Sequence, residues 1–293
     1  MGNNWKEIAK QKQLTFKKEL GLSQSGMHAG KEYTHILSNN DAEKGANFYC
    51  YNDKQELEQL EKWAKSQNRK VNFLSNGLKN MLRSEHIPYN LFYPLEKLRK
   101  KENGDLEKFL NSLFDFKMNI TKVLSIEIES ATNLHKNDLL KDNTSFDTYI
   151  EYLDENLKCG IGIEIKYTER SYPYGKTEIA RMDNVKDEYN ELTNRCGLFK
   201  TAAASELRKK ELKQPWRNHL LGIKLKEIGY LKKFHSVHLY PEGNLYQKEV
   251  CNEYENLINS DYKDSFIPLT FERFILELEP YDIKITKYLK DRY

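Results

Sequence analysis

The sequence predicts a mixed α/β fold with one core and appended helices, and three observations point to it. Residues 123–130 alternate apolar and polar side chains, as a half-buried strand does. Residues 145–152 and 159–168 alternate in the same way and are joined by a polar turn, which is typical of an antiparallel hairpin. The order along the chain is helix, strand, hairpin, helix, strand, and this order favours one sheet packed against helices.

Amphipathic helices are predicted before and after these strands. Asp53 is expected to cap a helix over residues 54–66, where apolar residues recur at helical spacing. A helix over 71–83 is expected not to continue past Pro88, because proline interrupts a helix interior. By similar patterns we expect helices over residues 5–20, 105–114, 183–195, 215–229, 249–259 and 271–278, and a strand over 234–240.

Length and composition allow either one large domain or two small ones. The chain has 293 residues, of which 31% are charged, and its formal net charge is +3. Because acids nearly balance bases, a surface that binds nucleic acid requires that the charges be segregated on the molecule. We expect a helical or extended extension over residues 1–70 and a main domain over 71–293, with one continuous domain as the alternative.

Some classes of protein are disfavoured by this sequence. The four cysteines are widely separated and form no C-x-x-C pair, which disfavours a zinc site built from them and a disulfide framework. No apolar run reaches the ~18 residues of a membrane span, and no apolar segment follows Met1. We therefore expect a cytoplasmic protein that does not contact a membrane.

The histidines do not predict a metal site. His235 and His238 are three residues apart on a predicted strand and therefore face opposite sides of it. His86, beside Glu85, is interpreted as a surface or hydrogen-bonded histidine rather than as half of a ligand pair.

The hairpin over residues 145–168 is where we expect the chemistry. Alternation places Asp147 on one face of the first strand, and Glu164 and Lys166 on one face of the second. Because the hairpin is expected to bury the shared apolar face of its two strands, these three side chains should converge on the opposite face. Two carboxylates and a lysine on a rigid sheet can hold a divalent cation and assist phosphodiester hydrolysis. The predicted apolar faces are Phe146, Thr148, Ile150 and Tyr152 in the first strand, and Ile161, Ile163, Ile165 and Tyr167 in the second.

A charged face without function is the alternative for these residues. An acid, any residue and then a lysine occur in that order five times in the chain, so the triplet alone is a weak signal. Only Glu164-Ile-Lys166 lies in a predicted strand with an acidic strand just upstream; Asp282-Ile-Lys284 is strand-like but lacks one. A solvated sheet face with a cross-strand ion pair therefore stays open beside a metal site.

The strand over residues 123–130 carries two more acids. Its alternation puts Leu124, Ile126 and Ile128 on one face, and Glu127 and Glu129 on the other. Since this strand precedes the hairpin, we expect its acids to extend the same cluster.

Six short segments carry a resemblance to a known family. They are Asn90-Leu-Phe-Tyr-Pro-Leu95, Ile126-Glu-Ile-Glu129, Thr144-Ser-Phe-Asp147, Gly162 to Glu169, Gln214-Pro-Trp-Arg-Asn218 and Tyr240-Pro241. In this order, over roughly residues 30 to 280, they resemble the PD-(D/E)XK nuclease superfamily and, within it, a prokaryotic restriction-endonuclease-like family. One departure is Phe146, which stands where the superfamily has a proline before the acid.

The resemblance implies a core of the order α-β-β-β-α-β, with a mixed β-sheet flanked by helices and with appended N-terminal helices. It implies a Mg²⁺-dependent DNA endonuclease, with Mn²⁺ as a substitute ion, acting in restriction, phage defence or a mobile element. Asp147 and Glu164 would bind the ion together with the carbonyl of Ile165. Lys166 would orient or deprotonate the attacking water.

Other implied site residues come with alternatives. Glu129, or else Glu127, would complete the metal shell or hold a second ion. Gln214 and Arg217 would contact phosphate or the metal shell, while a helix cap and a surface charge are the alternatives for them. The function itself has two alternatives: a DNA-binding or assembly module without catalysis, and a nuclease directed at RNA. The resemblance leaves open whether the protein acts as a homodimer.

Overall fold

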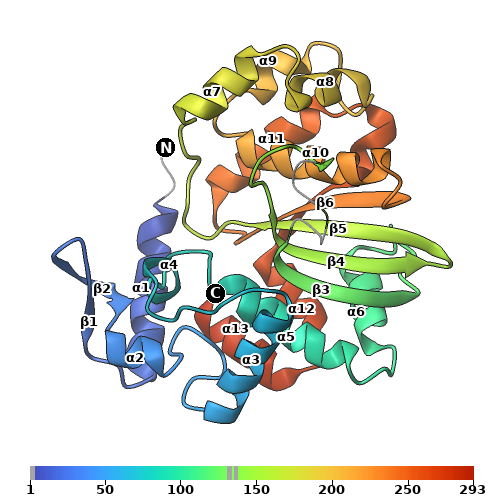
Figure 1. The fold of residues 1–293 in the computed structure, drawn as a ribbon. Coiled ribbons are helices and arrows are strands. Elements are labelled where there is room, and N and C mark those ends of the chain that lie inside the picture. The colour runs from blue at the N-terminus through green and yellow to red at the C-terminus, as the bar shows by residue number, and fades with distance from the viewer. Residues whose placement is uncertain (1–3, 131–133, 135–137) are drawn as a thin grey trace.

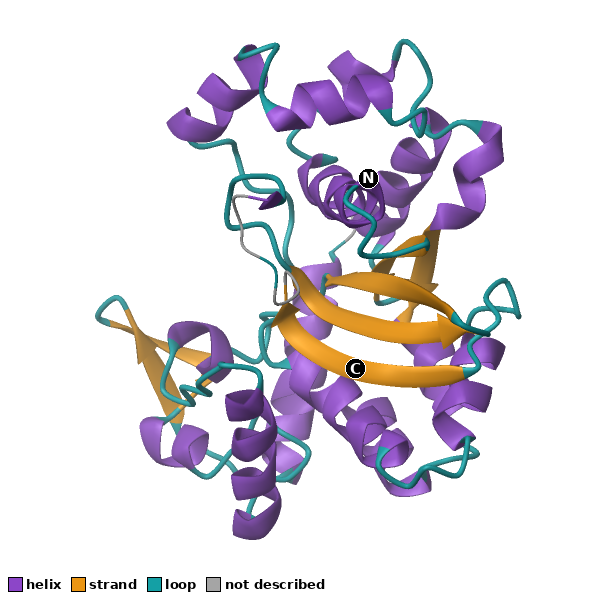
Figure 2. Ribbon diagram, turned by 45° about the vertical axis from the view of Figure 1, so that its right-hand side comes forward, coloured by secondary structure: helices purple, strands orange, loops and turns teal. Residues whose placement is uncertain are grey.

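A five-stranded mixed β-sheet lies at the centre of the molecule, with helices on both of its faces (Figure 1 and Figure 2). The computed structural model describes residues 4–130, 134 and 138–293, and residues 1–3 of the predicted extension lie outside this range. β3, β4 and β5 are antiparallel neighbours, whereas β5, β6 and β7 run parallel. The order across the sheet is β3 (Lys122–Ser130), β4 (Phe146–Asp154), β5 (Leu157–Ile165), β6 (Lys233–Tyr240) and β7 (Phe266–Thr270).

This sheet confirms the predicted fold class and the strands predicted from alternation, and it adds β7. β7 has the sequence Phe-Ile-Pro-Leu-Thr and forms an edge of the sheet. A proline cannot donate to a strand ladder, so it is tolerated at an edge but weakens the strand signal in a sequence. The hairpin turn is also tighter than predicted, because only Glu155 and Asn156 separate β4 from β5.

Each face of the sheet has its own hydrophobic core. The first core contains the apolar hairpin residues Ile150, Ile161, Ile163 and Ile165, as predicted. It is covered by α5 (Ile87–Arg99), α6 (Asp105–Leu113), α12 (Phe271–Leu278) and α13 (Ile283–Arg292). The second core lies under α8 (Glu188–Arg195), α10 (Lys213–Glu227) and α11 (Leu245–Leu257).

The N-terminal segment packs against the first core. The indole of Trp5 donates to the carbonyl oxygen of Tyr167 at 2.7 Å. The buried amide of Gln13 donates to the Tyr167 hydroxyl at 2.9 Å and to the Arg292 carbonyl at 2.8 Å. These contacts join the start of the described chain to the end of β5 and to α13. The elements of the segment are α1 (Trp5–Glu19), β1 (Ser25–His28), β2 (Lys31–Leu37), α2 (Asn39–Glu43), α3 (Lys54–Ser66) and α4 (Asn76–Lys79).

The helix predicted after Asp53 is found, whereas the helix boundaries predicted around Pro88 are wrong. Asp53 caps α3 as predicted, since its Oδ1 accepts from the Glu56 N–H at 3.0 Å. The predicted helix over 71–83 is wrong, because the residues of α4 alone are helical there. Pro88 begins a helix instead of interrupting one: it lies in the first turn of α5, where no backbone N–H donor is needed.

Two further predictions near the C-terminal half are corrected. The predicted helix over 183–195 begins later than expected, because residues 184–187 are not helical and α8 begins at Glu188, while Asp183 is the last residue of a separate helix, α7 (Lys176–Asp183). The Asn190 amide donates to the carbonyls of Met182 and Asn184 across this break. The strand-like segment at 282–284 is the start of α13, where the Asp282 carboxylate caps the N–H of Ile285 at 3.0 Å. The remaining short helix is α9 (Ala203–Leu207).

Alternation in β3 is interrupted near its start. The ladder with β4 shifts register between Val123 and Ser125, which is the mark of a bulge. Val123 is therefore buried in the first core, while Leu124, predicted to face it, is only partly buried. A bulge of this kind has no composition signal in the strand itself.

Phe146 lies over the opposite face of the sheet from the one that alternation predicts. Its ring packs on those of Tyr149 and Phe234, at centroid distances of 5.6 and 5.5 Å, in the second core. Gly162 leaves the space for it, since a Cβ atom there would come within 2.3 Å of the Phe146 ring. The missing side chain on β5 thus lets an aromatic ring occupy the face on which α10 packs.

The cysteines, the helix lengths and His86 bear on the classes of protein and site that the sequence disfavours. All four cysteines are free thiols. Among the described residues, no helix combines the length and the apolar character that crossing a bilayer requires. His86 is buried and accepts a hydrogen bond from the Arg292 guanidinium at 3.1 Å, so its interpretation as a hydrogen-bonded histidine is confirmed.

Candidate active site

Asp147, Glu164 and His238 form a row across three neighbouring strands. In the β4–β5 ladder Thr148 pairs with Ile163, so Asp147 and Glu164 occupy the next opposite positions. In the parallel β5–β6 ladder Glu164 pairs with His238. Residues directly opposite one another share a face of a sheet. The row therefore lies on one face, and α10 covers that face.

Glu164 and Lys166 form a buried ion pair. The Lys166 Nζ lies 2.6 Å from Oε1 of Glu164, and the two residues are 9% and 4% exposed. Burial acts to raise the pKa of Glu164, but the charge of Lys166 and the hydrogen bonds to the carboxylate outweigh it, so this pKa lies below its ordinary value. Burial acts to lower the pKa of Lys166, but Glu164 and Asp147 outweigh it and raise this pKa. Lys166 is therefore a cation at neutral pH.

Ionisation is less favourable for Asp147 than for Glu164. Its Oδ2 accepts a hydrogen bond from the backbone N–H of Ile165 at 2.7 Å, which holds it at the end of β5. Burial and the charge of Glu164 raise the pKa of Asp147 well above its ordinary value, and Lys166 offsets this only in part. A cation bound between the two carboxylates would relieve the repulsion between them.

Helix α10 holds Glu164 from above the sheet. Asn218 Nδ2 donates to Oε2 of Glu164 at 2.5 Å, and Gln214 Nε2 donates to Oε1 at 3.3 Å. Gln214 is one of the predicted residues, and the structure brings it to the carboxylate. Asn218 is a site residue that our sequence reasoning missed. Its signal was available, because residues four apart lie on the same face of a helix.

The two acids of β3 are not brought to this pair. Glu129 has a φ of +47°, which breaks the alternation of the strand, and its carboxylate lies 3.9 Å from the Arg69 guanidinium. Glu127 accepts hydrogen bonds from two serine hydroxyls. Within residues 4–130, 134 and 138–293, no group of three or more His, Cys, Asp or Glu side chains could hold a metal ion. The expected extension of the cluster by Glu127 or Glu129 is therefore not seen.

Arg217 is held by acids on the loop before β4 and on α7. Its guanidinium lies 2.8 Å from Asp142 and 2.7 Å from Glu178, and it donates to the Thr144 hydroxyl at 2.7 Å. The carboxylates of Asp142 and Glu178 thus neutralise the charge of Arg217 within the protein. Its contact with a substrate stays a prediction, although the side chain lines the cavity described next.

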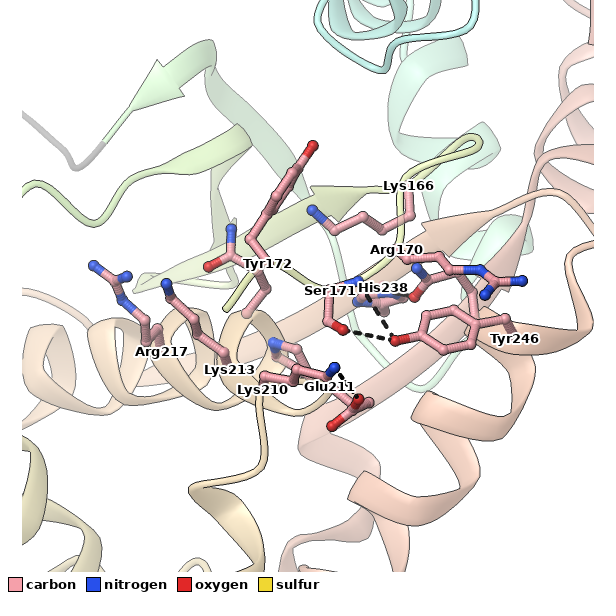
Figure 3. A pocket seen from close by; sticks show the side chains of 13 residues that line it. Lys166, Arg170, Ser171, Tyr172, Lys210, Glu211, Lys213, Arg217, His238 and Tyr246 are labelled. Atoms are coloured by element: carbon pink, nitrogen blue, oxygen red, sulfur yellow. Dashed lines mark hydrogen bonds and ion pairs between the residues drawn. The ribbon is translucent and has the colours of Figure 1, made fainter. Parts of the chain in front are cut away.

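A cation-rich cavity of about 180 Å³, which we call the Lys166 cavity, opens beside this ion pair (Figure 3). Its wall is formed by the segment that follows β5, the start of α10 and the residues before it, β6 and the start of α11. Of the described residues that line it, Glu211 is the one acid. An excess of cations over acids favours a polyanion such as nucleic acid, but four of the five cations here are paired with carboxylates and Arg170 is the one that is not, among the described residues. The cations of the lining are Lys166, Arg170, Lys210, Lys213 and Arg217.

His238 is a neutral histidine at the edge of the Lys166 cavity. Its Nε2 lies 3.0 Å from the amide oxygen of Gln247, and burial lowers its pKa to about 4. His235 pairs with Ile161 of the apolar face of β5, so the two histidines face opposite sides as predicted. His238 is the second residue that our sequence reasoning left out of the site.

The donor set fits a hard divalent cation. Asp147 and Glu164 supply carboxylate oxygens, the ligands that Mg²⁺ prefers, and Mg²⁺ is usually bound by one or two carboxylates together with water and substrate phosphate. Two acids therefore suffice for Mg²⁺, whereas a zinc site needs three or four nitrogen, sulfur or oxygen ligands from the protein. The carbonyl of Ile165 as a further ligand stays a prediction.

The fold and this pair of acids agree with the resemblance noted in the sequence. The chain belongs to the PD-(D/E)XK nuclease superfamily, whose family model matches residues 2–293, nearly the whole chain. Comparison with curated proteins and with solved structures found no match. Membership in a superfamily of nucleases implies phosphodiester chemistry on a nucleic acid.

Proposed function

We propose that this protein is a Mg²⁺-dependent DNA endonuclease that uses Asp147, Glu164 and Lys166. The observation that supports it is the position of Asp147 opposite Glu164, with Lys166 2.6 Å from Glu164 at the wall of the cation-rich Lys166 cavity. The alternative of a solvated sheet face fits less well, because the ion pair of Glu164 and Lys166 is buried and a second carboxylate beside it, that of Asp147, has a raised pKa. A role in restriction, phage defence or a mobile element is part of the proposal and rests on the family alone.

In the hydrolysis, the oxygen of a water bonds to phosphorus and the water gives up one proton, while one P–O ester bond breaks and the leaving oxygen takes up one proton. Held by Asp147 and Glu164, Mg²⁺ would neutralise charge at the scissile phosphate. Lys166, with its raised pKa, is suited to stabilise negative charge that develops on the phosphoryl oxygens rather than to accept a proton as a base. Gln214 and Asn218 orient the Glu164 carboxylate.

Cleavage of supercoiled plasmid in the presence of Mg²⁺ tests the proposal. We expect nicked or linear products that EDTA abolishes. Lys166→Ala should reduce the rate about 100-fold or more, because it removes a positive charge aimed at the developing negative charge. The matched control is Lys284→Ala, which removes an exposed lysine of α13 and should leave the rate unchanged.

Three results would contradict the proposal in different ways. Equal rates for Lys166→Ala and the unaltered protein would reject this site. Cleavage of RNA but not of DNA would reject the substrate class. Salt-sensitive DNA binding without cleavage, indifferent to EDTA and to Asp147→Ala, would favour a binding module.

A further inference from the structure

A second, larger cavity continues from the Lys166 cavity toward the N-terminal segment. We call it the N-terminal cavity, and its volume is about 550 Å³. Arg170, Tyr172 and Tyr246 line both cavities, so the two adjoin. The other walls come from α1, β2 and the residues before α5, through Trp5, Lys6, His35 and Arg83.

An exposed aromatic ring and an unpaired cation lie where the two cavities meet. Tyr172 is 48% exposed, and its hydroxyl accepts a hydrogen bond from the Arg83 guanidinium at 3.0 Å. Arg170 is exposed and has no carboxylate partner in the part of the chain that the structure describes. Its guanidinium lies over the ring of Tyr246, 5.5 Å from the centroid. In Figure 3 Tyr172, Arg170 and Tyr246 surround the same space as Lys166.

The one carboxylate that lines the N-terminal cavity among the described residues does not neutralise the positive charge of its exposed cations. Of the described residues that line the N-terminal cavity, Glu169 is the one carboxylate. It is buried, and it accepts hydrogen bonds from the backbone N–H groups of Ser84, Tyr167 and Thr168. Its charge is thus stabilised inside the protein, while Lys6 and Arg170 remain exposed to whatever enters the cavity.

We propose that the N-terminal cavity binds an unpaired stretch of the substrate DNA next to the cleavage site, with a base stacked on Tyr172 and a phosphate at Arg170. The inference rests on the nuclease function proposed above. Aromatic side chains beside cations are how proteins bind single-stranded nucleic acid. A double helix keeps its bases stacked on one another and offers none to Tyr172. The volume also lies in the range of sites that hold a small ligand, about 300–1,000 Å³, and not a double helix.

Binding without cleavage tests the cavity by itself. A short fluorescein-labelled oligothymidylate is titrated with protein in EDTA, and the anisotropy gives Kd. We expect Tyr172→Ala to raise Kd about fivefold or more, as the loss of one stacked base does. Tyr172→Phe, which keeps the ring and loses the hydrogen bond to Arg83, should retain most of the affinity. The matched control is Tyr262→Ala, which removes an exposed tyrosine of the segment before β7.

The cation is tested through the salt dependence of the same binding. Arg170→Ala should make the slope of log K against log salt shallower by about 0.7, the value for one phosphate contact on a single strand. Tyr172→Ala should leave this slope unchanged, because stacking releases no counterion. Lys284→Ala, which removes an exposed cation elsewhere, should change neither the slope nor Kd.

A cleavage comparison separates this inference from the proposed function. The same duplex is cut with Mg²⁺ as a blunt fragment and with a single-stranded flank at either end. We expect faster cleavage of the flanked substrate and a smaller preference in Tyr172→Ala. Kd values for Tyr172→Ala and Arg170→Ala that equal the Kd of the unaltered protein would overturn the cavity proposal and leave the nuclease standing. The absence of a preference for a flanked substrate would do the same. Binding that behaves as expected without any Mg²⁺-dependent cleavage would overturn the nuclease and leave the cavity as a binding site for single-stranded DNA.

Discussion

Two carboxylates and one ammonium group lie close together at the end of β5, where Glu164 and Lys166 are buried and Asp147 is partly buried. Lys166 compensates the charge of Glu164, as the opposite shifts of their pKa values indicate. Asp147 is the additional anion, and its raised pKa expresses the energy of placing a second negative charge beside the first. An arrangement that is unfavourable by itself and favourable with a cation is what a metal site requires.

Asp147→Asn should therefore stabilise the protein in the absence of metal. Because the folded state raises the pKa of Asp147, the stability present below its ordinary pKa of 3.8 is lost as the pH rises toward the raised folded value. Asparagine keeps an acceptor for the Ile165 N–H but has no charge to bury beside Glu164. In EDTA at neutral pH we expect a higher Tm for the variant, and the difference should vanish near pH 3.

The same thermal scans with Mg²⁺ complete this prediction. Mg²⁺ should raise the Tm of the unaltered protein and leave that of Asp147→Asn nearly unchanged, since one ligand charge is gone. Asp183→Asn, at the exposed end of α7, is the control and should follow the unaltered protein. A variant that is less stable than the unaltered protein in EDTA at neutral pH would contradict this account of Asp147.

Among the elements, α10 connects the sheet to the candidate site. Gln214, Asn218 and Gly222 recur every four residues and so share one face of the helix. The first two bond to Glu164. At Gly222 a Cβ atom would lie 1.9 Å from the Phe234 ring, so the absence of a side chain lets α10 pack close to β6. Close packing at Gly222, and hydrogen bonds from residues one and two turns before it, hold the carboxylate in place.

Asn218→Ala should weaken metal binding more than it slows the cleavage step. Loss of a hydrogen bond that orients a metal ligand typically lowers metal affinity about 10- to 100-fold. We expect the Mg²⁺ concentration for half-maximal cleavage to rise by about that factor, and the rate to recover at saturating Mg²⁺. The control is Lys226→Ala, on the same helix but without a contact to Glu164 among the described residues. A lower maximal rate at an unchanged Mg²⁺ dependence would mean that Asn218 acts on the substrate instead.

At the scale of the whole molecule, the N-terminal segment and the sheet share one core. Ala9, Leu60 and Trp63 pack in the same cluster as the hairpin isoleucines. Gln13 and Trp5 bond to residues more than 150 positions away in the chain, with separations of 154 and 162. Separation of the segment would expose apolar surface and leave buried polar groups without partners, which costs about 1–3 kcal/mol for each such group.

The chain should therefore unfold as a single unit. We expect coincident denaturant transitions by tryptophan fluorescence and far-ultraviolet circular dichroism, which is the test of two-state behaviour. Gln13→Ala should shift both transitions to lower denaturant together, because it removes the bonds to Tyr167 and Arg292. Gln11→Ala, on an exposed part of α1, should shift neither. Two separate transitions, or a stable folded fragment of residues 71–293, would contradict a single unit.

The local pattern of apolar and polar residues in the sequence determined the hairpin and the positions of its two acids. Period-two alternation and a tight hairpin place Asp147 and Glu164 opposite one another, because pairing in a hairpin is set within some twenty residues of chain. The same reasoning failed at Glu129, whose positive φ turns it to Arg69, and at Phe146, whose ring fills the space above Gly162. Neither departure has a signature in the residues that flank it.

Tertiary structure alone decided which distant residues serve the hairpin. Asn218 reaches Glu164 from 54 positions away, and the N-terminal cavity combines Trp5 with Tyr172 and Tyr246. Helical periodicity indicates which residues share a face of α10, but not which strand that face meets. That choice depends on how two layers of side chains pack, through the space left at Gly162 and Gly222, and no single segment contains both layers.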